Sequence, residues 1–475
     1  MGAKVWLATR AVCRYDTIVN MDTLNRRAFL AALGCGAPLA AAQGEDAVTV
    51  ATDHPRLFLR PARLRLLRRE RERASPRWQQ FEALVAGAAP LPERPFALAL
   101  YYQISGDKEA GRQALGSLAD PAADPRQFAL LFDWCQDLLS ETETRDMAAR
   151  LEKSMAATAG DDAVAAVRSR IMAAVALFDH VPAAPQRELE RTVRVWWPAR
   201  FVAGLTGAGG GATRDEAYPL FELLHAVRDN TMLDLRESSP RFLKDLPIQH
   251  LLSYYPAAYR APENDFYIGA TRLPGPPDLR RAALSRAAEL AMVAYDTNAL
   301  ESQLLQGWLM HDDFMLRGPF GAPYEFLWAN PYQPGLSYDH APLVYHDPAT
   351  GRLFARSNWD DSARWFGYFE GAAQIFDSGR VTTLNPRQAV PALSLGSAAI
   401  CFGSGSPKFR IALEREQPVF LVGLEPRRAY QVEVDGQEMF ETTADTGGIL
   451  ELSLPKMRET GIRVRPAPRP PATGG

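Results

Sequence analysis

Residues 345–379 read YHDPATGRLFARSNWDDSARWFGYFEGAAQIFDSG, and the character of the chain changes at this stretch. Before it the sequence predicts one helix after another, and after it short strands separated by turns. Asp360 and Asp361 stand between two aromatic-rich runs, where short acidic side chains tolerate turn conformations, so the pair predicts a hairpin turn. The stretch therefore predicts a boundary between a helical region and a β region.

The region before this boundary has the apolar periodicity of helices. Leu130, Leu131, Trp134 and Leu138 show the spacing of three and four residues. Helices are expected over residues 96–104, 126–139, 141–158, 163–180, 186–197, 219–229 and 279–295. The lack of alternating strands and helices argues against a parallel nucleotide-binding sheet. A set of helices of this kind, predicted over 50–318, suits either a toroid or a solenoid.

Two segments interrupt the helices. Residues 206–213 are rich in glycine, and residues 256–277, here called the insert, are rich in proline, glycine and aromatic residues. Loops on a helical scaffold commonly carry binding sites, so both segments are candidates.

Past the boundary, short runs bounded by Gly, Asp or Pro predict strands over 351–357, 364–369, 398–403, 418–423, 429–434 and 448–454. Asp435-Gly436 predicts a further hairpin turn. The expected fold class is α+β with several domains, in which a β-sandwich over 335–465 follows the helical domain. The proline-rich segment 466–475 is expected to be a disordered tail.

Length and charge limit the function classes. A chain of 475 residues exceeds one ordinary core, so two or three domains are expected. The formal net charge of −3 comes with no basic stripe, which argues against a nucleic-acid partner. No apolar run is long enough for an internal membrane span. The oligomeric state is left open.

The N-terminus predicts export. Residues 25–30 read NRRAFL, and an apolar, alanine-rich run continues to Ala42, so residues 1–42 resemble an N-terminal extension and a Tat-type signal peptide. Met21 is the expected start, because such signals begin shortly before the arginines. The protein is thus expected to be periplasmic or secreted. A lipoprotein anchor at Cys35 is not expected, since the apolar stretch before it is very short.

Three patches of the sequence resemble the heparinase II/III-like polysaccharide lyases of the alginate lyase/heparinase superfamily. They are HPRLFLRP at 54–61, the glycine-rich loop running into RDEAY at 214–218, and GRLFARSNWDDSARWFGYFEG at 351–371. The family combines an incomplete (α/α) toroid with an antiparallel β-sandwich and cleaves uronic-acid polysaccharides by β-elimination. The resemblance implies an acidic polysaccharide or oligosaccharide as the partner and no cofactor. Elimination needs a group that neutralises the uronate carboxylate, a base and an acid.

Tyr218 is the first candidate for acid and base. It precedes Pro219, which is expected to start a helix, and both the positive end of that helix and Arg214 would favour a tyrosinate. Glu216 could orient the site, and Arg214 or Arg200 could neutralise a carboxylate. The alternative is that Tyr218 packs its ring in the core with its hydroxyl satisfied.

Further candidates come from the helices and from the start of the β region. His340 and His346 could reach the site from the sandwich side or close the domain interface. The candidates for substrate binding are Arg200, His225, Tyr254, Tyr255 and Trp308. His250, Trp196 and Trp197 could also line a sugar cleft, although core packing is the alternative for the aromatic residues and for His225. A metal site at His311-Asp312-Asp313 is not expected, because adjacent residues do not share a face.

The sequence departs from the family pattern in two places. The chain has no Asn between Asn25 and Asn230, so the family's Asn-His neutraliser has no counterpart before the glycine-rich loop. In the β region, the family's histidines after the hairpin would correspond to Ala373 and Ile375, which cannot transfer protons. The lyase apparatus would then be missing at both places.

Three functions follow as hypotheses. The first is an exported lyase that uses Tyr218 and an arginine neutraliser. The second is a catalytically degenerate relative that binds acidic glycans or a partner. The third is a glycoside hydrolase with paired carboxylates such as Glu216 and Asp312, which would have to lie within roughly 5 to 10 Å across one cleft.

Overall fold

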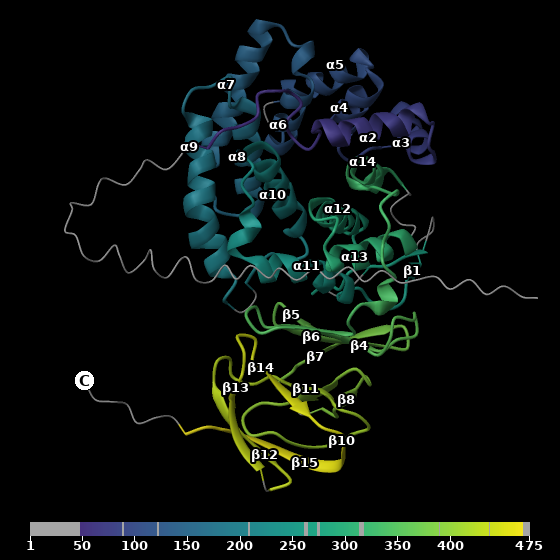
Figure 1. The fold of residues 1–475 in the computed structure, drawn as a ribbon, viewed down its shortest axis with the longest axis vertical. Coiled ribbons are helices and arrows are strands. Elements are labelled where there is room, and N and C mark those ends of the chain that lie inside the picture. Colours follow the sequence, from purple (N-terminus) through teal and green to yellow (C-terminus); the bar gives the residue numbers. More distant parts are fainter. Residues whose placement is uncertain are drawn as a thin grey trace, which may run out of the picture. The chain divides into compact units, whose positions relative to one another are not determined.

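The chain runs from helices to strands, as the sequence predicts (Figure 1). The computed structural model describes residues 48–468, except 88–89, 121–122, 208–209, 261–264, 273–275, 313–317, 389 and 437. The predicted signal peptide, Cys35, Asp313 and the end of the predicted tail lie outside the described residues. Residues from Val48 onward belong to one compact unit.

Most of the helical region consists of α-helices joined by short turns. They are α2 (Pro61–Glu72), α3 (Pro76–Ala86), α4 (Arg94–Ser105), α5 (Lys108–Gly116), α6 (Pro125–Trp134), α7 (Glu141–Ala157), α8 (Val164–Leu177), α9 (Ala184–Arg191), α10 (Ala217–Thr231), α11 (Pro240–Leu252), α12 (Leu279–Tyr295), α13 (Leu300–His311) and α14 (Gly318–Trp328). The 3₁₀ segments η3 (Gln136–Leu138) and η7 (Tyr338–His340) and the π-helical segment η4 (Thr192–Val202) complete the part used below. Every predicted helix is present.

Six helices are neighbours in succession. α4 packs on α6, α6 on α8, α8 on α10, α10 on α12 and α12 on α14, and α14 returns to α3 and α4. α8 and α12 are buried along most of their length, which fits their position between neighbouring helices. The helical region extends to Trp328 rather than ending at the predicted boundary of 318, since α14 belongs to this succession.

The described residues of the β region form three sheets. The first has the order β3-β4-β5-β6-β7, the second β14-β11-β9-β8 and the third β10-β15-β12-β13. Their strands are β3 (Val344–Asp347), β4 (Arg352–Arg356), β5 (Trp365–Phe369), β6 (Ala372–Asp377), β7 (Arg380–Leu384), β8 (Leu393–Ser394), β9 (Ala399–Phe402), β10 (Lys408–Leu413), β11 (Gln417–Val422), β12 (Ala429–Val434), β13 (Glu438–Thr443), β14 (Ile449–Leu454) and β15 (Met457–Pro466). Two short strands, β1 (Tyr259–Arg260) and β2 (Asp265–Phe266), lie in the insert.

Both predicted hairpins are confirmed. β4 and β5 pair antiparallel on either side of Asp360 and Asp361, and β12 and β13 pair on either side of Asp435-Gly436. The second sheet is mixed rather than purely antiparallel, because β9 pairs parallel to β11. β15 continues to Pro466, where the tail was predicted to begin.

Alternating side chains link the second sheet to both of its neighbours. Along β11, Phe420 and Val422 belong to the apolar cluster shared with the first sheet, while Val419 and Leu421 belong to the cluster shared with the third. Successive residues of a strand point to opposite faces, so β11 is buried on both sides and is apolar at nearly every position.

The first sheet uses its other face against the helices. Phe354, Trp365 and Phe376 belong to the same apolar cluster as the helical core, and the Trp365 indole Nε1 donates to the Leu252 carbonyl at the end of α11, at 2.7 Å. This face of the first sheet therefore meets the helical region. Among the residues that the structure describes, no helix has the length and apolar character needed to span a bilayer.

Candidate functional site

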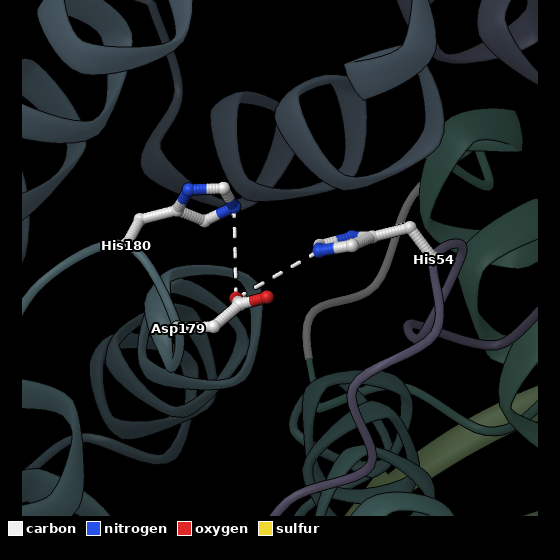
Figure 2. A group of neighbouring side chains, drawn as sticks. All are labelled: His54, Asp179 and His180. Atoms are coloured by element: carbon white, nitrogen blue, oxygen red, sulfur yellow. Dashed lines mark ion pairs between the residues drawn. The ribbon is translucent and has the colours of Figure 1, made fainter.

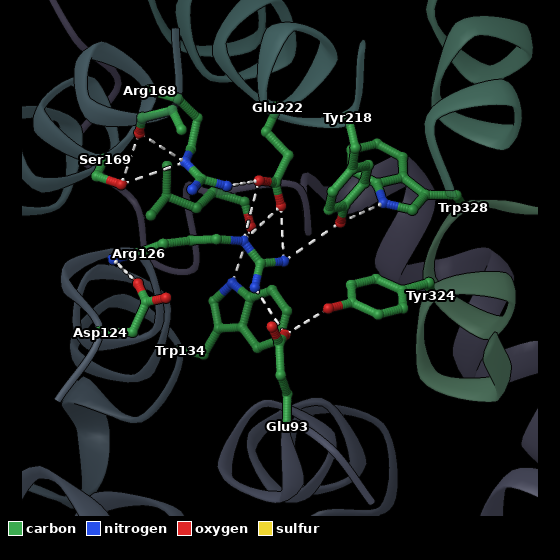
Figure 3. A network of polar contacts seen from close by, with 12 residues as sticks. Glu93, Asp124, Arg126, Trp134, Arg168, Ser169, Tyr218, Glu222, Tyr324 and Trp328 are labelled. Atoms are coloured by element: carbon green, nitrogen blue, oxygen red, sulfur yellow. Dashed lines mark hydrogen bonds and ion pairs between the residues drawn. The ribbon is translucent and has the colours of Figure 1, made fainter. Parts of the chain in front are cut away.

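Tyr218 lies within a buried group of charged and aromatic side chains (Figure 3). The Arg126 guanidinium donates to both oxygens of Glu222, at 2.8 and 2.9 Å, and to Glu93 at 2.8 Å. Its remaining nitrogen lies 3.3 Å from the Tyr218 hydroxyl, and Arg168 makes a second ion pair with Glu222. Two carboxylates thus face two guanidinium groups near the N-terminal ends of α4, α6, α8 and α10.

Two residues of α14 complete this group, here called the Tyr218 group. The Trp328 indole Nε1 donates to the Tyr218 hydroxyl at 3.2 Å, and the Tyr324 hydroxyl donates to Glu93. Burial, together with the charge of Glu222, raises the pKa of Tyr218 well above its usual value, although Arg126 acts in the opposite direction. The expected lowering of the Tyr218 pKa is therefore wrong, because loss of hydration outweighs the helix end and the nearby arginine.

Arg214 lies in a second polar group, with Glu289, His250 and Tyr254. Its guanidinium donates to Glu289 at 3.0 Å and to the His250 carbonyl at 2.6 Å, and it lies over the Tyr254 ring. Tyr254 donates its hydroxyl to Glu289, and Arg286 bonds to the same carboxylate. Arg214 is thus already paired with a carboxylate.

The charges of this second group are balanced once Asp312, which pairs with Arg286, is counted. Burial alone would raise the pKa of Glu289, but Arg286, His250 and Arg214 lower it to about 2. Burial and the charge of Arg214 lower the pKa of His250 to about 4, and burial raises the pKa of Tyr254. At neutral pH the group therefore consists of a carboxylate, a neutral imidazole, a neutral phenol and two guanidinium groups.

Gly269 in the insert lets the chain approach Arg214. A Cβ atom at this position would lie 2.4 Å from the guanidinium carbon. Any larger residue would therefore displace Arg214 or the insert, so the position of the insert is coupled to that of Arg214.

Two adjoining pockets flank the insert. One, of about 290 Å³, is lined by Arg214, Asp215 and Arg281, and the other, of about 340 Å³, by Tyr255 and Gln374. The two share lining residues Ile268, Thr271 and Pro277. The predicted residues Arg214 and Tyr255 thus line neighbouring pockets.

Trp308 lies in an aromatic cluster that includes Tyr267 of the insert. The cluster, here called the aromatic cluster, consists of Tyr267, Trp308, His311, Tyr338 and Trp359. The Trp308 ring centroid lies 4.7 Å from that of Tyr267 and 5.0 Å from that of Tyr338. His311 is exposed and the two tyrosines and Trp359 are half-buried, so the cluster faces both the core and solvent.

Two buried hydrogen-bond donors at this cluster have no acceptor among the described residues. One is the Trp308 indole Nε1 and the other is Nη1 of Arg356, whose guanidinium lies 4.1 Å from the centroid of the Trp359 ring. Trp308 and Arg356 are 2% and 1% exposed, so both donors are shielded from bulk solvent. Unpaired buried donors are uncommon in native proteins and call for an explanation.

Glu216 closes the turn before α10. Its carboxylate accepts from the Thr213 backbone N–H and hydroxyl, both at 3.0 Å. Asp312 instead bonds to Arg286, and Asp313 lies outside the described residues. The two carboxylates that the hydrolase hypothesis pairs are therefore held by separate partners.

Of the remaining helical candidates, Arg200 is exposed and lies apart from the Tyr218 group and from the aromatic cluster, whereas His225, Trp196 and Trp197 are buried core residues. Arg200 has a 71% exposed side chain beside Asp162. His225 is fully buried, its Nε2 lies 3.0 Å from the Ala291 carbonyl, and burial lowers its pKa. Trp196 and Trp197 are core residues.

The two histidines of the β region differ. His340 is exposed on η7. His346 on β3 lies between Asp445 and Glu451, at 2.9 and 2.8 Å. Burial alone would lower its pKa, but the two carboxylates raise the pKa of His346 to about 9.

The structure gives Ala373 and Ile375 a packing role. Both face the apolar cluster between the first and second sheets, whereas Gln374 between them points the other way. Gln374 accepts from the Tyr255 hydroxyl at 2.8 Å and donates to the Thr271 carbonyl at 2.9 Å. Residues 373 and 375 are therefore apolar because this strand face is buried, and Gln374 fixes the insert.

The charged partners in both polar groups are not predicted from the sequence. Arg126, Glu222, Glu289 and Arg286 were not singled out. A signal was present, because Glu222 and Glu289 each stand within an apolar helical run, where a charge must be paired.

Comparisons with known proteins do not identify a family. No family model and no curated protein matches the chain. A solved structure described as "Glycoside hydrolase" covers 82% of this chain and 76% of its own, at 10% sequence identity and a TM-score of 0.34. Similarity at this level carries no argument about fold or activity, and the resemblance to the heparinase II/III-like lyases stays a prediction.

Proposed function

We propose that this protein binds an acidic, uronate-containing glycan at the aromatic cluster without cleaving it. The observation that carries the proposal is a pair of donors, on Trp308 and Arg356, that have no acceptor in the described part of the chain and lie beside aromatic rings that reach the surface. Aromatic rings stack on the apolar faces of sugar rings, and a guanidinium group is a favoured partner for a carboxylate.

Each of these two N–H donors favours a ligand that carries hydrogen-bond acceptors. A buried donor without a partner costs about 1–3 kcal/mol, and a ligand oxygen would recover that free energy. A uronate supplies a carboxylate for Arg356 and hydroxyl or ring oxygens for Trp308. Both donor atoms are covered in this structure, so ligand binding requires side chains around the cluster to move.

Elimination at Tyr218 receives less support. Tyr218 is 3% exposed, its hydroxyl is held by Arg126 and Trp328, and its pKa is raised. A buried phenol whose proton is held more tightly than usual is a poor base at neutral pH. Arg214, the expected neutraliser, already has Glu289 as its counter-ion.

The proposal includes the architecture and the location of the protein. The succession of helices that returns from α14 to α3 and α4 supports an (α/α) toroid, and the three stacked sheets support a sandwich extended by one layer. The twin-arginine pattern supports Tat export of the folded chain to the periplasm or beyond, where acidic polysaccharides are encountered.

The test compares two tyrosines of one loop. Calorimetric titration of the wild type with an oligouronate should show saturable binding, whereas a neutral β-glucan oligosaccharide should not bind. Tyr338→Ala should weaken oligouronate binding roughly two- to tenfold, since an aromatic contact contributes about 0.5–1.5 kcal/mol beyond its buried area. Tyr332→Ala, which removes a 55% exposed tyrosine outside the cluster, is the matched control.

Three results would contradict the proposal. They are the absence of oligouronate binding, equal effects of the two alanine variants, and binding of the neutral oligosaccharide alone. New ultraviolet absorbance from an unsaturated uronate product, lost in Tyr218→Phe, would show that the protein is a lyase.

A further inference from the structure

His54, Asp179 and His180 come together from distant parts of the chain (Figure 2). His54 lies in the segment before α2, and the other two residues lie in the turn after α8. His54 Nε2 lies 3.8 Å from Asp179 Oδ1, and His180 Nε2 lies 3.6 Å from the same oxygen. One ligand atom from each of the three residues lies within 4.8 Å of the others.

The Nδ1 atom of His54 already has a hydrogen-bond partner. It lies 2.6 Å from the Asp133 carboxylate, which also accepts from the backbone N–H groups of Arg56 and Leu57. This bond places the proton on Nδ1 and leaves the lone pair on Nε2, facing Asp179. A carboxylate behind a histidine in this manner is the usual support of a metal-ligating imidazole.

The Nε2 atom of His54 has no hydrogen-bond partner among the described residues, although it is shielded from water. The His54 side chain is 16% exposed. A cluster that served only to pair charges would be expected to satisfy this nitrogen. A metal ion between the three residues would satisfy it.

We propose that His54, Asp179 and His180 bind a divalent first-row transition metal ion of the zinc class. Two imidazoles and one carboxylate are a preferred ligand set for such ions and a poor one for Mg²⁺ or Ca²⁺. Zinc bonds of about 2.0–2.1 Å in tetrahedral geometry separate ligand atoms by about 3.3–3.4 Å. The 3.6 and 3.8 Å from the two imidazole nitrogens to Asp179 need only a small contraction, while the ligand atoms of the group as a whole lie within 4.8 Å and must draw together further.

The net charge around the three residues is compatible with a bound cation. Arg56 bonds to both oxygens of Asp179, at 2.8 Å each, and reduces the attraction for a metal ion. With Asp133 and Asp179 against Arg56, the group nevertheless carries one net negative charge. Each carboxylate oxygen has two lone pairs, so Asp179 Oδ1 can accept from Arg56 and bind a metal ion at once.

The fourth position faces Gln136 and solvent. The Gln136 amide nitrogen lies 2.7 Å from His180 Nε2, so it occupies this lone pair when no metal is bound. Metal binding displaces that hydrogen bond and leaves a position for water, since the Asp179 side chain is 39% exposed. The ion would join the segment before α2 to the turn after α8.

Cobalt provides the direct test. The full-length, tag-free protein is freed of metal with a chelator and titrated with Co²⁺. The wild type should bind one ion per chain with a visible absorption band of nitrogen–oxygen coordination. Zn²⁺ should abolish the band and raise the unfolding temperature, whereas Mg²⁺ should do neither.

Variants locate the ion. His180→Gln and Asp179→Asn should each lose the band, and so should His54→Gln if it folds. His340→Gln, which removes an exposed histidine elsewhere, should keep it. The proposal is overturned if the wild type gives no band and no Zn²⁺-dependent rise in unfolding temperature. It is also overturned if the band survives in both His180→Gln and Asp179→Asn.

Discussion

Replacing Glu222 by glutamine should destabilise the protein strongly, because two arginines depend on this carboxylate. Glu222 is fully buried and pairs with Arg126 and Arg168. With Glu93, the four charged groups sum to zero, and Glu222→Gln leaves one uncompensated positive charge in the core. Removing one partner of a buried ion pair costs about 3–5 kcal/mol.

The expected change in unfolding temperature follows from the size of the chain. The unfolding entropy of a protein this large is roughly 0.9 kcal/mol per kelvin, so the loss corresponds to a fall of about 3–6 °C. Circular dichroism or dye-based melting would measure it. Glu414→Gln, an exposed control, should stay within about 0.5 kcal/mol of the wild type.

A second substitution tests the charge argument itself. Adding Arg168→Met to Glu222→Gln restores neutrality, so the double variant should be more stable than the sum of the single effects by roughly 0.5–3 kcal/mol. The reasoning is refuted if Glu222→Gln melts within the range of the Glu414→Gln control. It is equally refuted if the single effects simply add.

Three other predictions concern the β region, the insert and the N-terminus. The two carboxylates beside His346 raise its pKa to about 9 from about 6.5, so its stabilising contribution is fully present below about pH 6.5 and is lost as the pH rises through about 9. His346→Gln should therefore lower the unfolding temperature more at about pH 6 than at about pH 10, and an equal effect at both would contradict this. Gln374→Ala should free the insert and speed limited proteolysis within residues 256–277, unlike the exposed control Gln388→Ala; equal cleavage rates would count against the anchoring role. Replacing both Arg26 and Arg27 by lysine should keep the precursor in the cytoplasm, as measured by cell fractionation. Undiminished export of this variant would exclude Tat transport.

The order of elements could be predicted from the sequence because each element carries its own local signal. Apolar spacing of three and four residues located the helices, and turn residues such as Asp435-Gly436 located hairpins. Pairing between distant strands has no such local signal. The parallel pair β9–β11 therefore could not be predicted, since it depends on which buried strands meet.

The candidate site was harder to predict because the roles of its residues depend on burial. Tyr218 was found by its position before a helix, but the sequence could not show that Glu222 and Trp328 enclose it. The family resemblance predicts lost catalytic positions at Ala373 and Ile375, whereas the alternation of apolar residues fits the buried strand face that the structure shows. Register relative to the neighbouring sheet decides between these interpretations, and register is set by the whole fold.

The first sheet contributes aromatic residues to the helical core on one face and to the sheet core on the other. Cutting the chain between α14 and β3 would leave Phe354, Trp365 and Phe376 exposed on one fragment and their helical contacts uncovered on the other. Neither fragment should fold by itself. Calorimetry should accordingly record a single melting transition for the helices and the first sheet together, and the two regions should have been inherited together rather than exchanged as separate modules.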